Sequence, residues 1–214
     1  MSEKFMPSDK VIKLHLSYTA PSGAATMFSG FSKGLREARE SSGRNLDTGD
    51  KLSNRSHASW LAFIGYMSLL DQIGSCFKPK GTPIEQGSAI TKALKYFSAL
   101  DEKSIDALYA LRNAFTHDFS LYNINTSKPQ FTQCFRVYGK CTGDVVELPK
   151  IAWNGDYNNR NNDNYTLINL EAFGDLVEDL CCKLFSLANS SDLEVTLQGG
   201  SDELLQRYSF YTQT

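Results

Sequence analysis

The stretch Asn169–Leu187, NLEAFGDLVEDLCCKLFSL, has the clearest packing pattern in the chain. Its large apolar residues recur in alternating steps of three and four, which places them along one side of a helix. They are Leu170, Phe173, Val177, Leu180, Leu184 and Leu187. Asn169 is a favourable N-cap, and Glu171 lies in the first turn, where the helix dipole stabilises negative charge. We therefore predict an amphipathic helix that packs its apolar side against the rest of the protein.

Four further helices are predicted before this one. Their expected bounds are about Ser22–Arg39, Ser56–Phe77, Thr82–Leu100 and Asp101–His117. The third has the strongest start signal, because Thr82-Pro83-Ile84-Glu85 combines a capping box with proline at the first helical position. Short connections between successive helices favour an antiparallel bundle. The fold class expected is mainly α.

The helical pattern is interrupted between the fourth helix and the last one. Within residues 118–167, apolar positions from Phe131 to Tyr138 and from Val145 to Leu148 predict a β-hairpin, with glycines at its tip. Asn154–Asn164 contains six Asn and two Asp in 11 residues, which favours turns. We predict one domain over residues 1–214, with bundle helices at about 22–117 and 168–190 and a hairpin insertion at about 118–167.

The two ends of the chain give weaker patterns. The first 20 residues are expected to be irregular, or to contain a short strand through Val11, Ile12, Leu14 and Leu16. The C-terminal segment, residues 190–214, is expected to hold one short helix around Asp202–Arg207.

Composition excludes several classes of protein. The chain has 214 residues, with 22 basic and 24 acidic side chains and a net charge of −2, which argues against a protein that coats DNA. The most apolar stretch, Trp60–Leu70, spans 11 residues, whereas a membrane span needs about 20. The five cysteines form no CxxC pair, so neither a disulfide framework nor a zinc site is expected. We expect a cytoplasmic protein with no metal, no cofactor and no membrane partner.

Several polar residues are better explained by structure than by chemistry. His57 is expected to pack or cap at the start of the second helix, and His15 has no evident partner. The cations Lys33, Arg36 and Arg39 alternate with Glu37 and Glu40, which predicts a solvated charged face. Cys181 and Cys182 are expected to be buried packing residues.

The segment Leu111–His117, LRNAFTH, is the one constellation that indicates a reaction. Asn113 and His117 are four residues apart and share a helix face, whereas Arg112 and His117 are separated by about 140° around the helix. Arginine presents a fixed charged fork to a phosphate, and histidine exchanges a proton near neutral pH. The alternative is structural, because a histidine in the last turn is stabilised by the helix dipole and an arginine can extend from an apolar face into water.

The motif Arg112-Asn113-x-x-x-His117, on a helix followed later by an amphipathic helix, resembles the HEPN superfamily. The resemblance covers about residues 22–117 and 168–190. It implies a dimeric, metal-independent endoribonuclease of the toxin or defence type, with two Arg/His pairs facing each other across the dimer. By this resemblance His117 is the general acid or base, Arg112 stabilises charge on the phosphoryl group and Asn113 holds the geometry.

Other members of the superfamily resemble inactive or nucleotide-binding forms, so the fold alone does not establish catalysis. The alternative is therefore a silent HEPN-like dimerisation, nucleotide-binding or regulatory module. The expected partners are a second copy of the chain, RNA or a nucleotide, and an antitoxin or another protein. The sequence identifies no substrate-binding residues beyond the motif. An unrelated helical bundle with structural Arg112 and His117 is the third hypothesis.

Overall fold

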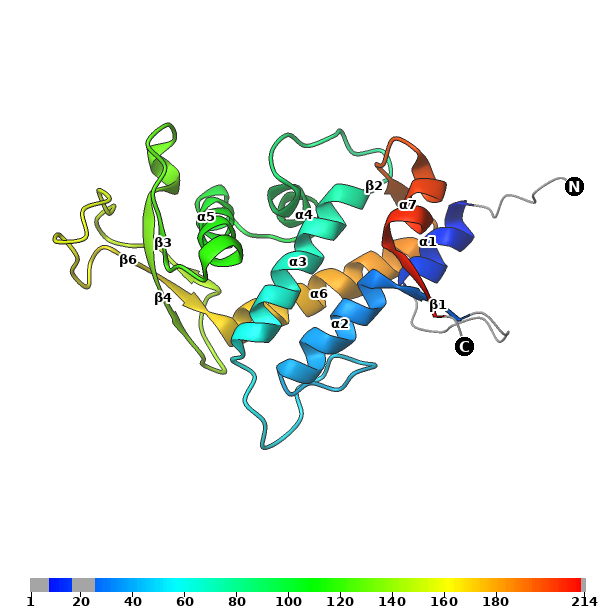
Figure 1. Cartoon of the computed structure of the whole chain (residues 1–214), viewed down its shortest axis with the longest axis horizontal. Helices are drawn as coiled ribbons and strands as arrows, with labels where there is room; N and C mark the ends of the chain where they lie inside the picture. Colours follow the sequence, from blue (N-terminus) through cyan, green and yellow to red (C-terminus); the bar gives the residue numbers. More distant parts are fainter. Residues whose placement is uncertain (1–7, 17–25, 213–214) are drawn as a thin grey trace, which may run out of the picture.

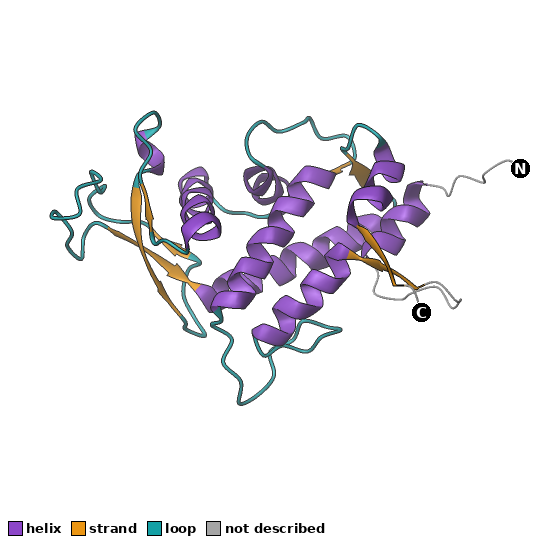
Figure 2. Cartoon of the chain, viewed as in Figure 1, coloured by secondary structure: helices purple, strands orange, loops and turns teal. Residues whose placement is uncertain are grey.

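The computed structural model describes residues 8–16 and 26–212, and the side chains of residues 8–16 and 29–209. These residues form a mainly α-helical structure with three small sheets (Figures 1 and 2). The helices are α1 Ser8–Leu16, α2 Gly30–Ser41, α3 Trp60–Cys76, α4 Ala89–Phe97, α5 Glu102–Asp118, α6 Leu170–Asn189 and α7 Gly200–Tyr208, with a 3-10 turn at Pro129–Phe131. Their buried apolar side chains form one contiguous core.

Helices α2, α3 and α6 make up the centre of the molecule. Figure 1 shows them lying along one another, whereas α4 and α5 are seen nearly end-on. A uniform antiparallel bundle, which the order of helices predicted, is therefore not confirmed. The start of α4 crosses α3 at Gly74, where an added Cβ would lie 1.8 Å from the carbonyl oxygen of Ala89. Only glycine permits this approach of the two backbones.

The apolar pattern of the last helix is confirmed. Asn169 caps α6 and accepts a hydrogen bond from the backbone of Ala172 at 3.4 Å. Five of the six seam residues are buried, and Leu187 is partly buried against the core. The predicted helix around Asp202–Arg207 is also present, as α7.

The predicted β-hairpin is wrong, because its two arms are not neighbours. The sheet has the order β3 (Tyr122–Asn123), β4 (Gln133–Tyr138), β6 (Tyr165–Asn169), β5 (Val146–Glu147). Strand β6 lies between the arms, pairing parallel with β4 and antiparallel with β5. It brings Thr166 and Ile168 into the core, and this burial favours a non-local pairing over the local turn.

Two short antiparallel pairs connect distant parts of the chain. Strand β1 (Thr26–Ser29) pairs with β8 (Ser209–Thr212), and β2 (Phe77–Pro79) pairs with β7 (Leu193–Val195). Both pairs join the C-terminal segment to the N-terminal half, at the end of the molecule opposite the four-stranded sheet (Figure 1).

The N-terminal segment and two predicted helix starts need correction. Residues 8–16 form α1, not an irregular segment or a strand, and bury Val11 and Ile12 on one side. Helix α2 begins at Gly30 behind the N-cap Ser29, and the expected cap Ser22 lies outside the described residues. Helix α3 begins at Trp60, four residues later than expected.

Helix α4 begins at Ala89 rather than at Thr82. The Thr82 hydroxyl donates to the carbonyl oxygen of Pro79 at 2.7 Å, so it caps no helix, and Ser88 takes that role by accepting from Thr91 at 3.3 Å. Gly87 has φ = +113°, a conformation that a right-handed helix cannot include.

A buried ion pair joins α2 to α6. The Arg39 guanidinium, on a residue that is 5% exposed, donates from Nε to both carboxylate oxygens of Glu178, at 3.0 and 3.1 Å, and from Nη2 at 2.7 Å. Burial alone would lower the pKa of Arg39, but the hydrogen bonds and charge of Glu178 outweigh it and raise that pKa above its ordinary value. The Tyr66 hydroxyl, on α3, donates to the same carboxylate at 2.8 Å. One carboxylate therefore holds three helices together.

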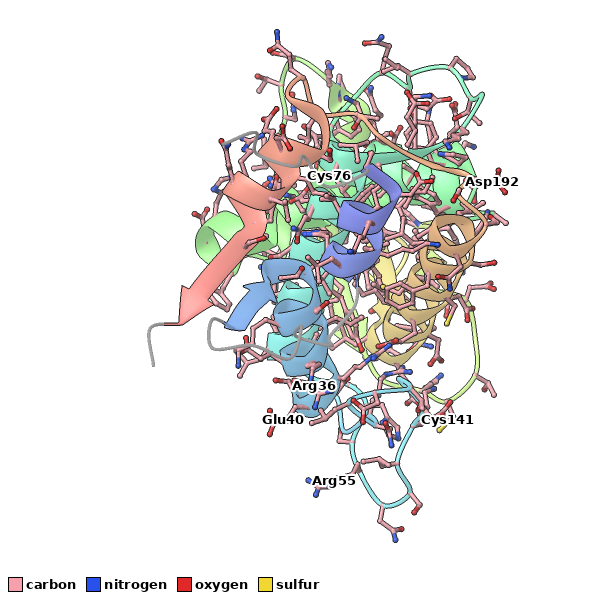
Figure 3. All side chains as sticks on the ribbon, turned by 90° about the vertical axis from the view of Figure 1, so that its right-hand side faces the viewer. Arg36, Glu40, Arg55, Cys76, Cys141 and Asp192 are labelled. Carbon is pink, nitrogen blue, oxygen red and sulfur yellow. The ribbon has the colours of Figure 1, made fainter. Side chains whose placement is uncertain are left out.

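The same network fixes the loop after α2. Arg39 also donates from Nη1 to the carbonyl oxygens of Leu46 and Asp47, at 2.9 and 3.0 Å. Arg44, itself buried, bonds Asp175 of α6 at 2.7 Å, and Lys51 bonds the same aspartate at 2.7 Å. Figure 3 shows the remaining part of this loop projecting beyond α2.

No helix within the described residues is long and apolar enough to cross a membrane.

We predict that Glu178→Gln lowers the free energy of unfolding by about 3 kcal/mol, because it leaves the charge of Arg39 buried without a counter-ion. Urea unfolding followed by circular dichroism measures the loss. Glu37→Gln is the matched control, since Glu37 pairs with Lys33 in solvent and its loss is expected to cost at most about 0.5 kcal/mol. Equal costs for the two variants would contradict a supporting role for the buried pair.

His15 gives the folded protein a pH dependence. Its ring is buried between Phe31, Phe77 and Tyr208, and this burial lowers its pKa to about 4. The unfolded chain binds the proton below about pH 6.5, whereas the folded chain resists it until about pH 4. Stability is therefore lost as the pH falls through this window.

We predict that the stability advantage of the wild type over His15→Gln shrinks by up to about 3 kcal/mol between pH 7 and pH 4. Urea unfolding at several pH values measures it. Because the wild type and His15→Gln share all other titrating groups, the contribution of those groups cancels in the difference between their free energies of unfolding. A difference that stays constant with pH would show that His15 does not titrate as its burial requires.

Candidate functional site

Helix α5 carries the predicted motif and has well-defined ends. Asp101 is its N-cap, as predicted, and accepts from the backbone of Lys103 at 2.9 Å and of Ser104 at 3.1 Å. Hydrogen bonds from Ser104 hold the pKa of this carboxyl below its ordinary value. The helix ends in Phe119, which adopts a left-handed conformation with φ = +54°. A bulky residue seldom occupies this region, and such strain is concentrated at functional sites.

Arg112 is held by an acidic residue of the neighbouring helix. Its Nε donates to Oδ2 of Asp71 at 2.8 Å, and its Nη2 lies 2.7 Å from the same oxygen. Its Nη1 donates to Oδ1 of Asn113 at 3.3 Å. The side chains of Arg112 and Asp71 are 30% and 25% exposed, so the ion pair remains accessible to solvent.

His117 lies apart from the other two motif residues. It is exposed in the last turn of α5, and no hydrogen bond or ion pair of the described residues joins it to Arg112 or Asn113. The structure thus brings Arg112 and Asn113 together, with His117 about one and a half turns further along the helix. Whether the three residues share a cleft with a second copy of the chain remains a prediction.

The arrangement leaves Arg112 able to bind an anion. A guanidinium has five N–H groups, and Asp71 and Asn113 engage three of them. The other two belong to Nη1 and Nη2, the pair of nitrogens that grips a phosphate in a fork. The imidazole of His117 is exposed, so a substrate can reach it. These groups suit binding of a phosphodiester and proton transfer to or from it.

Aromatic side chains surround the end of α5. Trp60, at the start of α3, stacks on Phe115 with ring centroids 4.7 Å apart, and Phe119 lies 5.5 Å from the same ring. Phe115 is buried, but Trp60 is 42% and Phe119 63% exposed. An exposed apolar surface of this kind is typical of an interaction site.

Sequence reasoning missed Asp71. The only signal for it was its position as the single acidic residue that ends the apolar run of Trp60–Leu70. It contacts Arg112 from 41 residues away, a separation that no helical periodicity reveals. Within the described residues, no group of three or more His, Cys, Asp or Glu side chains is arranged to hold a metal ion.

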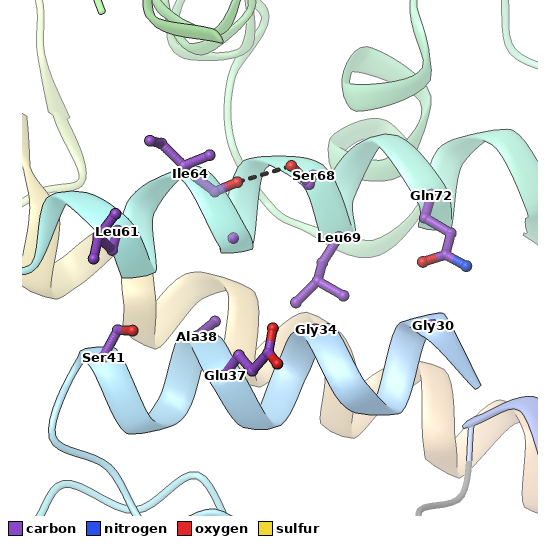
Figure 4. Close-up of a pocket in the computed structure, with 11 residues that line it drawn as sticks. Gly30, Gly34, Glu37, Ala38, Ser41, Leu61, Ile64, Ser68, Leu69 and Gln72 are labelled. Carbon is purple, nitrogen blue, oxygen red and sulfur yellow. Dashed lines mark hydrogen bonds between the residues drawn. The ribbon is translucent and has the colours of Figure 1, made fainter. Parts of the chain in front are cut away.

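The groove between α2 and α3 is a separate feature (Figure 4). It has a volume of about 350 Å³ and is lined by small residues such as Gly34, Ala38 and Gly65. The helices approach closely there, since a Cβ added to Gly65 would lie 3.1 Å from that of Ala38. Glu37 is the one charged residue lining it, and the motif residues take no part. The groove therefore follows from close helix packing and shows no reactive group.

Other candidate residues have structural roles. The Nδ1 atom of His57 lies 2.9 Å from the carbonyl oxygen of Ser42, at the end of α2. The predicted solvated face on α2 is confirmed for Lys33, Glu37 and Glu40, which are exposed, and Figure 3 shows Arg36 and Glu40 near the C-terminal end of α2. It is wrong for Arg39, which is buried against Glu178. Burial was predicted for both α6 cysteines, but only Cys181 is buried, whereas Cys182 is exposed.

No protein-family model matches the chain, and no curated protein or solved structure matches it significantly.

We predict that Asp71→Asn and Arg112→Gln each lower the free energy of unfolding by about 1 kcal/mol or less, because their ion pair is partly solvated. Thermal or urea unfolding of the two single variants and the double variant gives the coupling energy between them. We expect the double variant to cost less than the sum of the single variants. Strictly additive costs would mean that Asp71 does not hold Arg112.

Proposed function

We propose that this chain is a HEPN-like, metal-independent endoribonuclease whose site is built on the C-terminal half of α5. The observation that carries the proposal is the placement of Arg112. Asp71 and Asn113 fix its guanidinium while leaving two N–H groups, and an exposed histidine follows on the same helix. A guanidinium can stabilise the charge on the phosphoryl group and an imidazole can transfer protons, so together they can support phosphodiester cleavage without a metal.

The chemistry assigned to these residues is a transfer within the RNA strand. The ribose 2′-oxygen attacks the adjacent phosphorus, and the bond to the 5′-oxygen of the next nucleotide breaks. Loss of the 2′-hydroxyl proton to one imidazole and donation of a proton to the leaving oxygen by another balance the step. Arg112 stabilises the charge that builds on the phosphoryl oxygens, and Asn113 keeps its guanidinium in place. The products are a 2′,3′-cyclic phosphate and a 5′-hydroxyl.

A second copy of the chain completes this site. The step uses a proton acceptor and a proton donor, but the motif has a single histidine. A twofold axis near the end of α5 supplies the second His117 from the same sequence. The exposed side chains of Trp60 and Phe119 lie at that end and fit the apolar part of a subunit contact.

The alternative is a silent HEPN-like module that dimerises, binds a nucleotide or regulates a partner such as an antitoxin. One observation favours it: the charge of Arg112 is already balanced by Asp71 within one chain. An arginine in this state binds phosphate more weakly than a free one. The two functions are separated by activity, because only the nuclease cleaves RNA.

We predict that the purified protein cleaves single-stranded RNA in EDTA at the rate found without it, and that His117→Ala and Arg112→Ala each lower the rate at least 100-fold. Gel analysis of a labelled oligonucleotide measures cleavage, and the cyclic phosphate is identified by mass. Lys103→Ala, an exposed change at the other end of α5, is the control and should leave the rate unchanged. Activity that survives both motif variants would place the chemistry elsewhere, and no cleavage of any RNA would favour the silent module.

A further inference from the structure

The four-stranded sheet has one face toward the helical core and one face turned away from it, on which Cys134 is buried and Arg136 is exposed. Phe135, Thr166 and Ile168 point inward and are buried. Successive residues of a strand point to opposite faces, so Cys134 and Arg136 lie on the other side. The register pairs Cys134 with both Tyr122 and Tyr165, which places the two tyrosines on this outer face too. Figure 2 shows helices on the inner side of the sheet and loops on the outer side.

Two arginines lie against these tyrosines. The guanidinium carbon of Arg136 is 3.8 Å from the ring centroid of Tyr165. That of Arg160 is 5.7 Å from the ring centroid of Tyr122, and its Nη1 donates to the hydroxyl of Tyr122 at 2.9 Å. We call Tyr122, Arg136, Arg160 and Tyr165 the arginine–tyrosine face.

The two arginines carry charge that no carboxylate balances. Among the described residues, neither forms an ion pair. The acidic neighbours are otherwise engaged, because Asp163 pairs with Lys150 and Glu147 accepts a hydrogen bond from Tyr138. Both arginines are exposed, which leaves part of each fork open to a ligand.

We propose that the arginine–tyrosine face binds single-stranded RNA. Arginine forks grip phosphates, and aromatic rings and guanidinium planes stack on unpaired bases. Tyr157, 49% exposed, lies 5.3 Å from Tyr122 by ring centroids and extends the stacking surface. An acidic protein segment would use the two charges but would leave the planar surface without a role. The rings therefore favour a nucleic acid.

This inference rests on the proposed function for the choice of RNA, and it adds a binding surface outside the motif. Tyr122 follows His117 by five residues, so their Cα atoms are at most about 18 Å apart. A strand a few nucleotides long spans that distance. The face would hold the substrate while α5 acts on a neighbouring phosphate.

The test measures binding of a fluorescent 12-nucleotide single-stranded RNA by anisotropy, using full-length His117→Ala so that no RNA is cut. We expect the double change Arg136→Gln/Arg160→Gln, made in this background, to weaken binding about tenfold. It should also reduce the slope of log K against log salt by about 1.4, the value for two phosphate contacts on a single strand. The control is Lys33→Gln/Arg207→Gln, which removes the same charge from solvent-exposed ion pairs of α2 and α7 and should leave binding unchanged. Thermal unfolding confirms that both double variants are folded.

Each result decides the inference. If both double variants weaken RNA binding equally, the effect comes from net charge alone and the inference is overturned. An unchanged RNA affinity in Arg136→Gln/Arg160→Gln would also overturn it. Binding of a polyglutamate peptide as tight as that of RNA would assign the face to acidic proteins instead. The outcome is independent of the nuclease: a wild type that binds RNA through this face but cleaves none supports the inference and contradicts the proposed function. If His117→Ala abolishes cleavage but RNA binding is unchanged by the arginine substitutions, the proposed function is supported and the inference is contradicted.

Discussion

The buried carboxylate of Glu178 is the point at which the central helices meet. It receives the guanidinium of Arg39 from α2 and the hydroxyl of Tyr66 from α3, while its own helix, α6, supplies much of the core. A charge removed from water is costly unless its partners are complete, so none of these three groups can move independently. The network therefore specifies how α2, α3 and α6 lie against each other. Helix α3, positioned in this way, presents Asp71 to α5.

The ion pair between Arg112 and Asp71 is more exposed to solvent than the pair between Arg39 and Glu178. Arg39 and Glu178 are almost completely buried, whereas Arg112 and Asp71 each keep about a quarter or more of the side chain in solvent. A buried pair holds structure and has no room for a ligand. A half-exposed pair is positioned but still reachable, which is what the binding of a phosphate requires. The strained Phe119 and the exposed Trp60 lie at the same end of α5, so strain, charge and apolar surface occur together there.

The features predicted correctly from the sequence are those that depend on nearby residues. The caps Asp101 and Asn169 and the apolar seam of α6 depend on neighbours within a few residues, and all are confirmed. The predicted helix start at Thr82 was wrong because Gly87 interrupts the helix. The predicted hairpin was wrong because β6, rather than β5, pairs with β4. The burial of Arg39 depends on Glu178, 139 residues away, and a surface pattern on α2 could not indicate it. In the candidate site, the spacing within the sequence pointed to Arg112, Asn113 and His117, whose role stays a prediction, whereas the contact of Asp71 with Arg112 depends on tertiary structure.

The most direct test of the account is whether two copies of α5 meet at their C-terminal ends. Thr116→Cys, placed next to His117, is made in a background in which the exposed Cys141 and Cys182 are changed to serine, and is treated with a short bis-maleimide cross-linker. Lys103→Cys, at the other end of the helix, is the matched control. The account predicts a covalent dimer for position 116 and none for position 103. A protein that remains monomeric by light scattering, or a dimer that cross-links only through position 103, would contradict it.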